Sequence, residues 1–513
     1  MQALFSLRKA LTIALIAGLW PSCQSWGKFW SVPSTTCAPP ANSVSWAKSQ
    51  SGGNDVNRFF SVATDCEGNI YAAGFVQSTV TYNFGNGVTL TGNTAGAWKT
   101  AILLKYDAAG NALWGRRITS STTTESDYRS IAVDNSGNVY AVGTIYDSST
   151  FSFGNGVTLT TSLAANNHVV IAKYDSNGTA LWARTSNTFT GTAFYDAVAV
   201  DSSGNAYAGA RINYAGTLEV GNGVTVTSGV STTANWAVIK YNESGLAQWA
   251  NIAVAPAGAD YSYPLGITAD NLGSVFACGI ISNNGVFNFS GATAQGNFTG
   301  QNAAIAKFSA ATGSAIIARS TTAPSSAASN FNRCATDKSG QVYATGSQNL
   351  NGAYGWGGGI TSTGSATTAK NAVIVKYDNN LTPLWALSTS TGPGSAISQF
   401  NAVAADSAGN AWAAGFQEGN AAINYGNGVS ATGGFSGAGG NSLIVKYSAA
   451  GVPQLAKIVN PAGAFSFFDG VAVVGDLPVA VGLITNTGNF TFDTGLTTAG
   501  SHTTANVAIV KYP

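Results

Sequence analysis

Apolar and polar residues alternate in short runs along nearly the whole chain. In residues 129–184 the runs RSIAVD, NVYAVGT, HVVIAKYD and TALWAR follow one another, separated by the turns NSG and SNG and by one longer excursion. Alternation with a period of two, bounded by Gly, Asn and Asp, predicts four antiparallel β-strands. The excursion carries FSFGNGVTLT, whose Gly-Asn-Gly break predicts the tip of a β-hairpin. No stretch of residues 44–513 has a sustained helical period.

This unit of four runs recurs seven times. Its third run ends in Lys followed by an aromatic residue, at intervals of 65 to 70 residues: Lys105-Tyr106, Lys173-Tyr174, Lys240-Tyr241, Lys307-Phe308, Lys376-Tyr377, Lys446-Tyr447 and Lys511-Tyr512. Six copies carry a D-x-x-G turn before the second run, starting at Asp65, Asp134, Asp201, Asp270, Asp337 and Asp406. Seven four-stranded units predict an all-β chain folded as a seven-bladed β-propeller.

The fourth run supplies a test of ring closure. Only six copies follow the Lys-aromatic pairs: Leu113-Trp114, Leu181-Trp182, Gln248-Trp249, Ile316-Ile317, Leu384-Trp385 and Gln454-Leu455. The pattern of Ala112-Leu113-Trp114-Gly115-Arg116 reappears at the front of the chain as Val44-Ser45-Trp46-Ala47-Lys48. We therefore expect residues 44–48 to be the outer strand of blade seven, because the edge of that blade would otherwise be unpaired. The propeller would then span residues 44–513.

Over residues 44–513 these units resemble the bacterial seven-bladed β-propeller repeat family (SBBP-type). The resemblance rests on six copies of the D-x-x-G-N-x-Y-x-x-G motif or close variants of it, at a fixed period. Members of that family occur as exported proteins and as lipoproteins of the spirochaete type. The resemblance therefore implies the fold and export, and it supplies no catalytic residues.

The N-terminus has the features of an export signal. Arg8 and Lys9 precede an apolar run over residues 10–19, which is too short to span a bilayer. We predict a signal peptide over residues 1–22 and a tether over residues 23–43. Cys23 follows Leu-Trp-Pro-Ser, which resembles a relaxed lipobox, so we predict that Cys23 is lipidated; ordinary cleavage near Ser22 or Ser25 is the alternative.

These N-terminal features predict a protein of the bacterial cell envelope, either an outer-membrane lipoprotein or a secreted protein. Membrane attachment is expected only through the lipid anchor. If Cys23 carries lipid, four of the five cysteines remain for disulfide bonds in an oxidising compartment. A Cys37–Cys66 bridge would pin the ring closure. For Cys278 and Cys334 we favour a second bridge over two buried thiols.

Composition narrows the function classes. Only 9% of the residues are charged and the net charge is +1, with no basic run, which excludes a nucleic acid held by phosphate contacts. The two histidines, His168 and His502, occupy different places in their repeats, and no carboxylate pair stands out. The sequence therefore predicts no catalytic set, metal site or cofactor, and a protein that is not an enzyme.

Candidate binding residues lie near the start of the first run of each unit. An aromatic residue recurs six positions before the closing Asp, and the residue after it differs from unit to unit. Stacking platforms at a channel mouth and rings packed between blades are the two interpretations of the aromatic residues. We take as candidate binding residues Tyr128, Arg129, Tyr195, Asp196, Asn332, Asn401 and Asp469.

The expected function is a non-enzymatic, monomeric binding module on the bacterial surface. It would bind a glycan or a protein through the face that carries the excursions and the long joins between blades. A polysaccharide hydrolase or lyase acting in the channel and a structural surface component are the alternatives. The repeated lysines and tryptophans are expected to be structural, with each lysine paired to a turn aspartate.

Overall fold

The computed structural model describes residues 44–93, 98–186, 191–228, 233–256, 260–322, 327–437, 439–461 and 463–513. The chain divides into two compact units, residues 1–38 and 39–513, and the described residues belong to the second. The predicted signal peptide, the tether, Cys23 and Cys37 lie outside them. No helix that could cross a membrane occurs in the described part of the chain.

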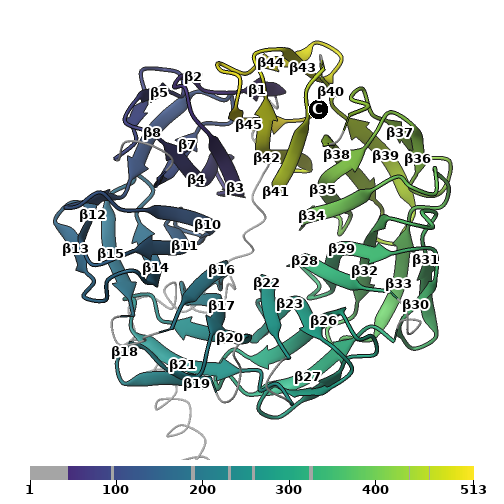
Figure 1. Ribbon diagram of the computed structural model, residues 1–513, viewed down its shortest axis with the longest axis horizontal. Coiled ribbons are helices and arrows are strands. Elements are labelled where there is room, and N and C mark those ends of the chain that lie inside the picture. Colours follow the sequence, from purple (N-terminus) through teal and green to yellow (C-terminus); the bar gives the residue numbers. More distant parts are fainter. Residues whose placement is uncertain are drawn as a thin grey trace, which may run out of the picture. The chain divides into compact units, whose positions relative to one another are not determined.

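The described residues are all-β, and they form seven four-stranded antiparallel sheets. Six of these sheets follow chain order: β3 (Asn57–Thr64), β4 (Ile70–Gln77), β7 (Lys99–Tyr106) and β8 (Ala112–Arg117); β10 (Ser126–Val133), β11 (Val139–Tyr146), β14 (Asn167–Tyr174) and β15 (Ala180–Thr185); β16 (Ala193–Val200), β17 (Ala206–Asn213), β20 (Ala234–Tyr241) and β21 (Ala247–Ile252); β22 (Ser262–Ala269), β23 (Ser274–Ser282), β26 (Gln301–Ser309) and β27 (Ala315–Ser320); β28 (Ser329–Thr336), β29 (Val342–Asn349), β32 (Lys370–Tyr377) and β33 (Pro383–Ser388); β34 (Ser398–Ala405), β35 (Ala411–Glu418), β38 (Gly440–Tyr447) and β39 (Pro453–Ile458). The sheets are arranged like propeller blades around a common axis, with the first strand of each innermost (Figure 1).

The last sheet combines the two ends of the described chain. Its order is β1 (Trp46–Lys48), β45 (Ala505–Lys511), β42 (Leu477–Thr485) and β41 (Ser466–Val474). Trp46 pairs with Lys511, just as Trp114 pairs with Lys105 in the first sheet. The innermost strand β41 also packs against β3. Strand β1 thus occupies the place that β8 has in its own sheet.

Smaller hairpins lie on the periphery of the sheets (Figure 1). They are β5 (Thr81–Asn83) and β6 (Thr89–Thr91) with β2 (Ser51–Gly52); β12 (Thr150–Gly154) and β13 (Val157–Thr160) with β9 (Thr119–Ser120); β18 (Gly216–Gly221) and β19 (Val224–Ser228); β24 (Val286–Asn288) and β25 (Thr293–Gln295); β30 (Ala353–Gly357) and β31 (Ile360–Thr363); β36 (Ala422–Asn424) and β37 (Ser430–Thr432); β43 (Asn489–Asp493) and β44 (Leu496–Ala499) with β40 (Asn460–Pro461). The Gly-Asn-Gly tip is confirmed: Asn155 has a φ of 52°, and its Nδ2 donates to the Ala180 carbonyl oxygen at 3.2 Å. Each tip asparagine of this kind anchors a hairpin to the outer strand of its own sheet.

The D-x-x-G turns are local structures that need no ligand. The Asp134 Oδ1 accepts from the backbone N–H groups of Ser136 and Asn138, both at 2.9 Å, and Gly137 has the positive φ of 76° that the turn requires. Apolar side chains of neighbouring sheets meet to form the core. One cluster joins Tyr140 and Ile171 to Tyr195 and Ile239, so the core lies between sheets rather than inside any one of them.

Candidate binding site at the channel mouth

A β-bulge interrupts the innermost strand of every sheet near its start. In β10 the register with β11 shifts between Tyr128 and Ser130, so Arg129 has no partner in the ladder. The same shift leaves out one residue in each of the other first strands. A bulge turns the extra side chain away from the face of its neighbours. The seven extra residues are Phe60, Arg129, Asp196, Leu265, Asn332, Asn401 and Asp469.

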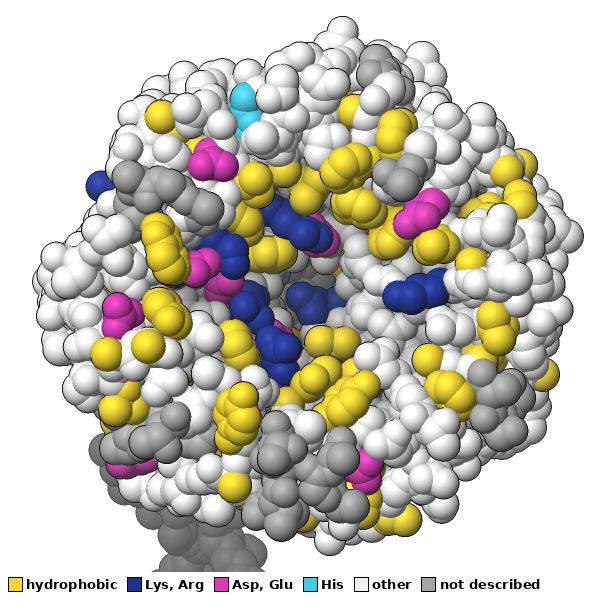
Figure 2. Space-filling model, viewed as in Figure 1, with side chains coloured by type: hydrophobic (Ala, Val, Ile, Leu, Met, Phe, Trp, Pro, Cys, Tyr) yellow, Lys and Arg dark blue, Asp and Glu magenta, His cyan; other side chains and the backbone are white. Residues whose placement is uncertain are grey.

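All seven bulged residues line one cavity of about 340 Å³, which we call the mouth cavity. Lys99, Asp127, Arg333 and Gln399 complete its wall. The bulges lie at the strand ends that receive the joins between sheets, so the cavity opens on the face with the long connections. Figure 2 shows the hollow at the centre of the molecule, with Lys and Arg side chains and several Asp and Glu side chains around it. The fold therefore places one variable residue from every sheet at a single site.

Ion pairs organise one part of the wall. Arg58 binds Asp469 with two parallel bonds, Nε to Oδ2 at 2.6 Å and Nη2 to Oδ1 at 2.5 Å. Asp196 receives Arg129 Nη1 at 2.8 Å and Arg211 Nε at 3.2 Å. Burial raises the pKa of Asp469, although Arg58 opposes that shift. These contacts hold charged side chains around the opening in fixed positions.

Lys99 and Asp127 extend this charged part. The Lys99 Nζ lies 3.1 Å from Glu125 Oε1 and 3.9 Å from Asp127 Oδ2, while Arg129 Nε lies 3.3 Å from Asp127 Oδ1. Burial alone would lower the pKa of Arg129, but the carboxylates of Asp127 and Asp196 raise it. Arg129 is therefore a permanent cation with two carboxylate partners.

Amide side chains form the opposite part of the wall. Asn332 accepts from Asn330 Nδ2 at 2.7 Å and donates its own Nδ2 to the Phe400 carbonyl oxygen at 2.8 Å. One sheet further on, Asn401 accepts from Gln399 Nε2 at 2.8 Å and donates to the Phe468 carbonyl oxygen at 2.9 Å. These amides link neighbouring sheets and present polar, uncharged groups to the cavity.

The structure corrects the prediction for two candidate residues, Tyr128 and Tyr195. Both side chains are fully buried. Their hydroxyl groups hydrogen-bond to Tyr174 at 2.8 Å and Tyr241 at 2.6 Å within the sheets. They pack between sheets because the bulge turns only the following residue toward the axis, so they offer no face to a ligand. The other candidates, Arg129, Asp196, Asn332, Asn401 and Asp469, all line the mouth cavity.

Sequence reasoning missed several residues of the wall. Phe60 and Leu265 are the bulged residues of their sheets and share the position of Arg129, but their apolar character hid them. Arg333 follows the bulge, at a position where the other sheets carry only small residues: Ser61, Ser130, Ala197, Gly266, Ala402 and Gly470. An alignment of the seven units by the bulge would have singled out Arg333 as the exception.

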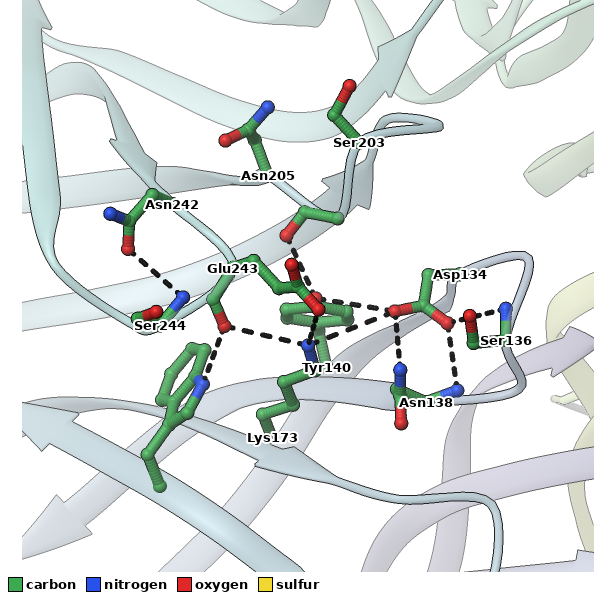
Figure 3. A network of polar contacts seen from close by, with 12 residues as sticks. Asp134, Ser136, Asn138, Tyr140, Lys173, Ser203, Asn205, Asn242, Glu243 and Ser244 are labelled. Atoms are coloured by element: carbon green, nitrogen blue, oxygen red, sulfur yellow. Dashed lines mark hydrogen bonds and ion pairs between the residues drawn. The ribbon is translucent and has the colours of Figure 1, made fainter. Parts of the chain in front are cut away.

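The repeated lysines and tryptophans join neighbouring sheets. Lys173 Nζ and Trp182 Nε1 both donate to the Glu243 carbonyl oxygen in the next sheet, at 3.5 Å and 2.9 Å. Lys173 also lies 3.9 Å from Asp134 Oδ2 and over the Tyr140 ring, as Figure 3 shows. The expected pairing of the lysine with the turn aspartate is present at four of the repeated lysines, Lys105, Lys173, Lys376 and Lys446. The described residues show no such ion pair at Lys240, Lys307 and Lys511.

Between the last sheet and the first, the same contact is made by residues from the two ends of the chain. Lys511 Nζ and Trp46 Nε1 donate to the Ala108 carbonyl oxygen at 3.0 Å and 3.1 Å. Lys105 and Trp114 bind the Ser176 carbonyl oxygen in the next sheet at nearly the same distances, 3.0 Å and 3.1 Å. Strand β1 therefore provides the tryptophan of the last sheet, as β8 does in the first sheet.

The cysteine predictions are corrected in one case. Cys278 and Cys334 are free thiols, both buried, so the predicted bridge between them is wrong. They pack as small apolar side chains in a cluster with Phe276 and Phe331. Burial raises the pKa of Cys278 well above its usual value. Cys66 is disulfide-bonded, and its partner lies outside the described residues.

The sheets and the shared cavity define an all-β protein of the propeller-like class. No family model and no curated protein matches the sequence. Among solved structures, quinohemoprotein alcohol dehydrogenase ADHIIG from Pseudomonas putida HK5 is 10% identical, with a TM-score of 0.33 over 91% of this chain and 75% of that one. The quinohemoprotein alcohol dehydrogenase from Comamonas testosteroni is 11% identical, with a TM-score of 0.35 over 91% and 76%. Similarity at this level transfers no activity to this chain.

Proposed function

We propose that the protein is an exported seven-bladed β-propeller of the bacterial repeat family, with β1 as the outer strand of the last blade. Three observations support this architecture. Seven four-stranded sheets form in the described residues, β1 pairs with β45, and Trp46 with Lys511 reproduces the contact between other neighbouring sheets. Export and lipidation of Cys23 rest on the sequence of residues 1–23.

We further propose that the propeller is a non-enzymatic binding module of the bacterial cell surface, with its site at the mouth cavity. The observation that carries this proposal is that one bulged residue from each of the seven sheets lines the same cavity. Neighbouring sheets contribute different side chains to it, except that Asn332 and Asn401 are both asparagine. A ring of similar blades needs such differences to fix the orientation of a ligand. The ion-paired part would contact charged groups and the amide part hydroxyl or amide groups.

The size and polarity of the cavity favour a glycan over a folded protein surface. Its volume lies near the lower end of the range of about 300–1,000 Å³ for small-molecule sites. A few sugar units would fill it, with Phe60 offering an apolar ring and the amides offering hydrogen bonds.

The alternative proposal, a hydrolase or lyase, needs a carboxyl group free to transfer a proton. A glycosidase places two carboxyl groups on either side of the bond that it cleaves. In the mouth cavity Asp127, Asp196 and Asp469 each bind an arginine. This arrangement suits the positioning of charges better than acid–base chemistry.

The test is a screen of the full chain against immobilised glycans and extracellular proteins, with product analysis on each hit. We expect a saturable hit whose ligand stays intact. Because each lost amide hydrogen bond costs about 1 kcal/mol, the double variant Asn332→Ala/Asn401→Ala should bind about tenfold or more weakly. Asn380→Ala, an exposed position on the opposite face, is the matched control and should bind like the unaltered chain.

The other outcomes each select an alternative. A cleaved ligand would replace the binding module with an enzyme. No hit, together with self-association in light scattering, would favour a structural surface component.

A further inference from the structure

Arg333 differs from the other two cations that line the mouth cavity, Lys99 and Arg129. Arg58, Arg129, Arg211 and Lys99 each have a carboxylate within 4.0 Å. Arg333 has none among the described residues, although its side chain lines the mouth cavity. Arg333 therefore has no direct ion pair among the described residues, although the carboxylates of Asp196 and Asp469 raise its pKa from a greater distance.

The guanidinium of Arg333 is fixed on one side only. Its Nη1 donates to the carbonyl oxygens of Leu265 and, at 3.1 Å, Asn332. Nε and Nη2 have no hydrogen-bond partner within the described residues. These two nitrogens form the edge that binds a carboxylate through two parallel bonds. Arg58 shows that geometry in the same molecule, since its Nε and Nη2 hold the two oxygens of Asp469.

The surroundings of Arg333 are adapted to its presence. Gly266, in the neighbouring sheet, leaves no room for a side chain, because a Cβ there would lie 2.7 Å from the Arg333 Cα. The close approach of the two strands lets the guanidinium reach the Leu265 carbonyl oxygen. Burial lowers the pKa of Arg333, so the positive charge is partly removed from water. A desolvated cation is costly unless an anion accompanies it.

We propose that the free edge of Arg333 binds the carboxylate of an acidic sugar, a uronate unit of a polysaccharide, at the channel mouth. This rests on the proposed binding function and names its ligand class. Arg333, a cation without a direct ion pair, shares the wall of the mouth cavity with the amides of Asn332 and Asn401 and with Phe60. A uronate matches that set with one carboxylate, several hydroxyls and one apolar ring face. An acidic peptide offers carboxylates but no ring of hydroxyl groups for the amides of Asn332 and Asn401 to bind.

The test is calorimetric titration of the full chain with trimers of galacturonate, glucuronate and mannuronate, and with their carboxyl-reduced counterparts. We expect at least one acidic trimer to bind more tightly than its reduced form. Arg333→Ser should lower the affinity for that trimer by roughly ten- to a hundredfold, because a charge-assisted pair of hydrogen bonds is lost. The affinity of Arg333→Lys should lie between the two, since an ammonium group keeps the charge but cannot form two parallel hydrogen bonds with a carboxylate.

Two controls separate recognition from folding. Serine is the residue at the equivalent positions Ser61 and Ser130, so Arg333→Ser is compatible with the fold, and its thermal unfolding should stay close to that of the unaltered chain. Lys338→Gln removes one positive charge from an exposed turn at the other end of the same sheet and should leave binding unchanged.

Each remaining outcome overturns a defined part of the proposal. If the reduced trimers bind as well as the acidic ones and Arg333→Ser binds equally, the uronate assignment fails while the binding module stands. If tri-glutamate binds more tightly than every uronate trimer, the ligand is an acidic peptide instead. If the folded chain binds none of these probes, the uronate assignment fails. The proposed binding function fails as well only if the screen of glycans and proteins also gives no hit.

Discussion

The outer contacts between sheets and the mouth cavity use the repeat in opposite ways. In five of the seven sheets, Lys and Trp at the periphery both donate to a turn carbonyl oxygen of the next sheet, as at Glu243 and Ala108. At the mouth, equivalent positions hold an arginine, an aspartate, an asparagine, a leucine and a phenylalanine. Packing imposes the same demand on every sheet, whereas recognition of one ligand does not. Side chains that repeat therefore stabilise the contacts between sheets, and side chains that vary are the candidates for binding.

The largest expected effect is at the junction of the two chain ends. Trp46 is 6% exposed and packs against Gly110, where a Cβ would lie 2.6 Å from its ring. Trp46→Ala should lower the free energy of unfolding by about 3–5 kcal/mol, because a large buried ring and its hydrogen bond are lost. Chemical denaturation measures this. Leu113→Ala, exposed on an outer strand, is the control and should cost less than about 1 kcal/mol.

The junction between the fourth and fifth sheets sharpens the comparison. Here a different residue replaces each member of the pair formed elsewhere by an outer-strand tryptophan and a turn glycine of the next sheet, such as Trp46 and Gly110. Ile317 occupies the place of the tryptophan, and the buried Leu381, with a φ of 55°, occupies the place of the turn glycine. We expect Leu381→Gly to cost about 2 kcal/mol, since the cavity outweighs the relief of a left-handed backbone. Ile317→Trp should cost a similar amount through steric overlap.

The double variant Ile317→Trp/Leu381→Gly should recover about 1–2 kcal/mol relative to the sum of the single changes, because it restores the Trp–Gly pair that is present at five other junctions. A double-mutant cycle by denaturant unfolding measures the coupling. Strict additivity would show that the two residues do not replace the pair as a unit.

A smaller effect concerns pH. His502 accepts or donates hydrogen bonds with Gln50, Asn57 and Thr504 where the last sheet meets the first. Burial lowers the pKa of His502 below 6.5. The unfolded chain therefore binds a proton more readily than the folded one, and stability should fall as pH drops below about 6.5, by no more than about 1.4 kcal/mol per pH unit.

Thermal unfolding at pH 7.5 and pH 5 measures this loss. His502→Gln keeps hydrogen-bonding groups but does not titrate, so it should reduce the difference between the two melting temperatures. An unchanged difference would assign the pH dependence to other groups.

The smallest effect on stability is expected at the mouth itself. Asn401→Ala removes two hydrogen bonds at a site open to water, so the free energy of unfolding should change by about 1 kcal/mol or less. Urea denaturation of the variant measures it. A loss as large as that of Trp46→Ala would show that the mouth residues stabilise the fold.

The sequence predicted the strands and the repeat, because alternation and turn residues are local signals. It placed Arg129, Asp196, Asn332, Asn401 and Asp469 in the variable set that lines the cavity. It did not distinguish them from Tyr128 and Tyr195, because the bulge that turns one residue inward and its neighbour into the core depends on pairing with the next strand. Arg333 was missed for the same reason. The state of Cys278 and Cys334 depends on how two adjacent sheets pack, which spacing along the chain does not determine.

The most direct test of the central claim measures affinity and stability on the same variants. For a glycan retained in the screen, the dissociation constant and the free energy of unfolding would be determined for the unaltered chain and for Asn332→Ala/Asn401→Ala. The account predicts that binding weakens about tenfold or more while the ligand stays intact and the unfolding free energy changes by no more than about 2 kcal/mol. Unchanged affinity in the folded variant, or a ligand altered by the protein, would contradict it.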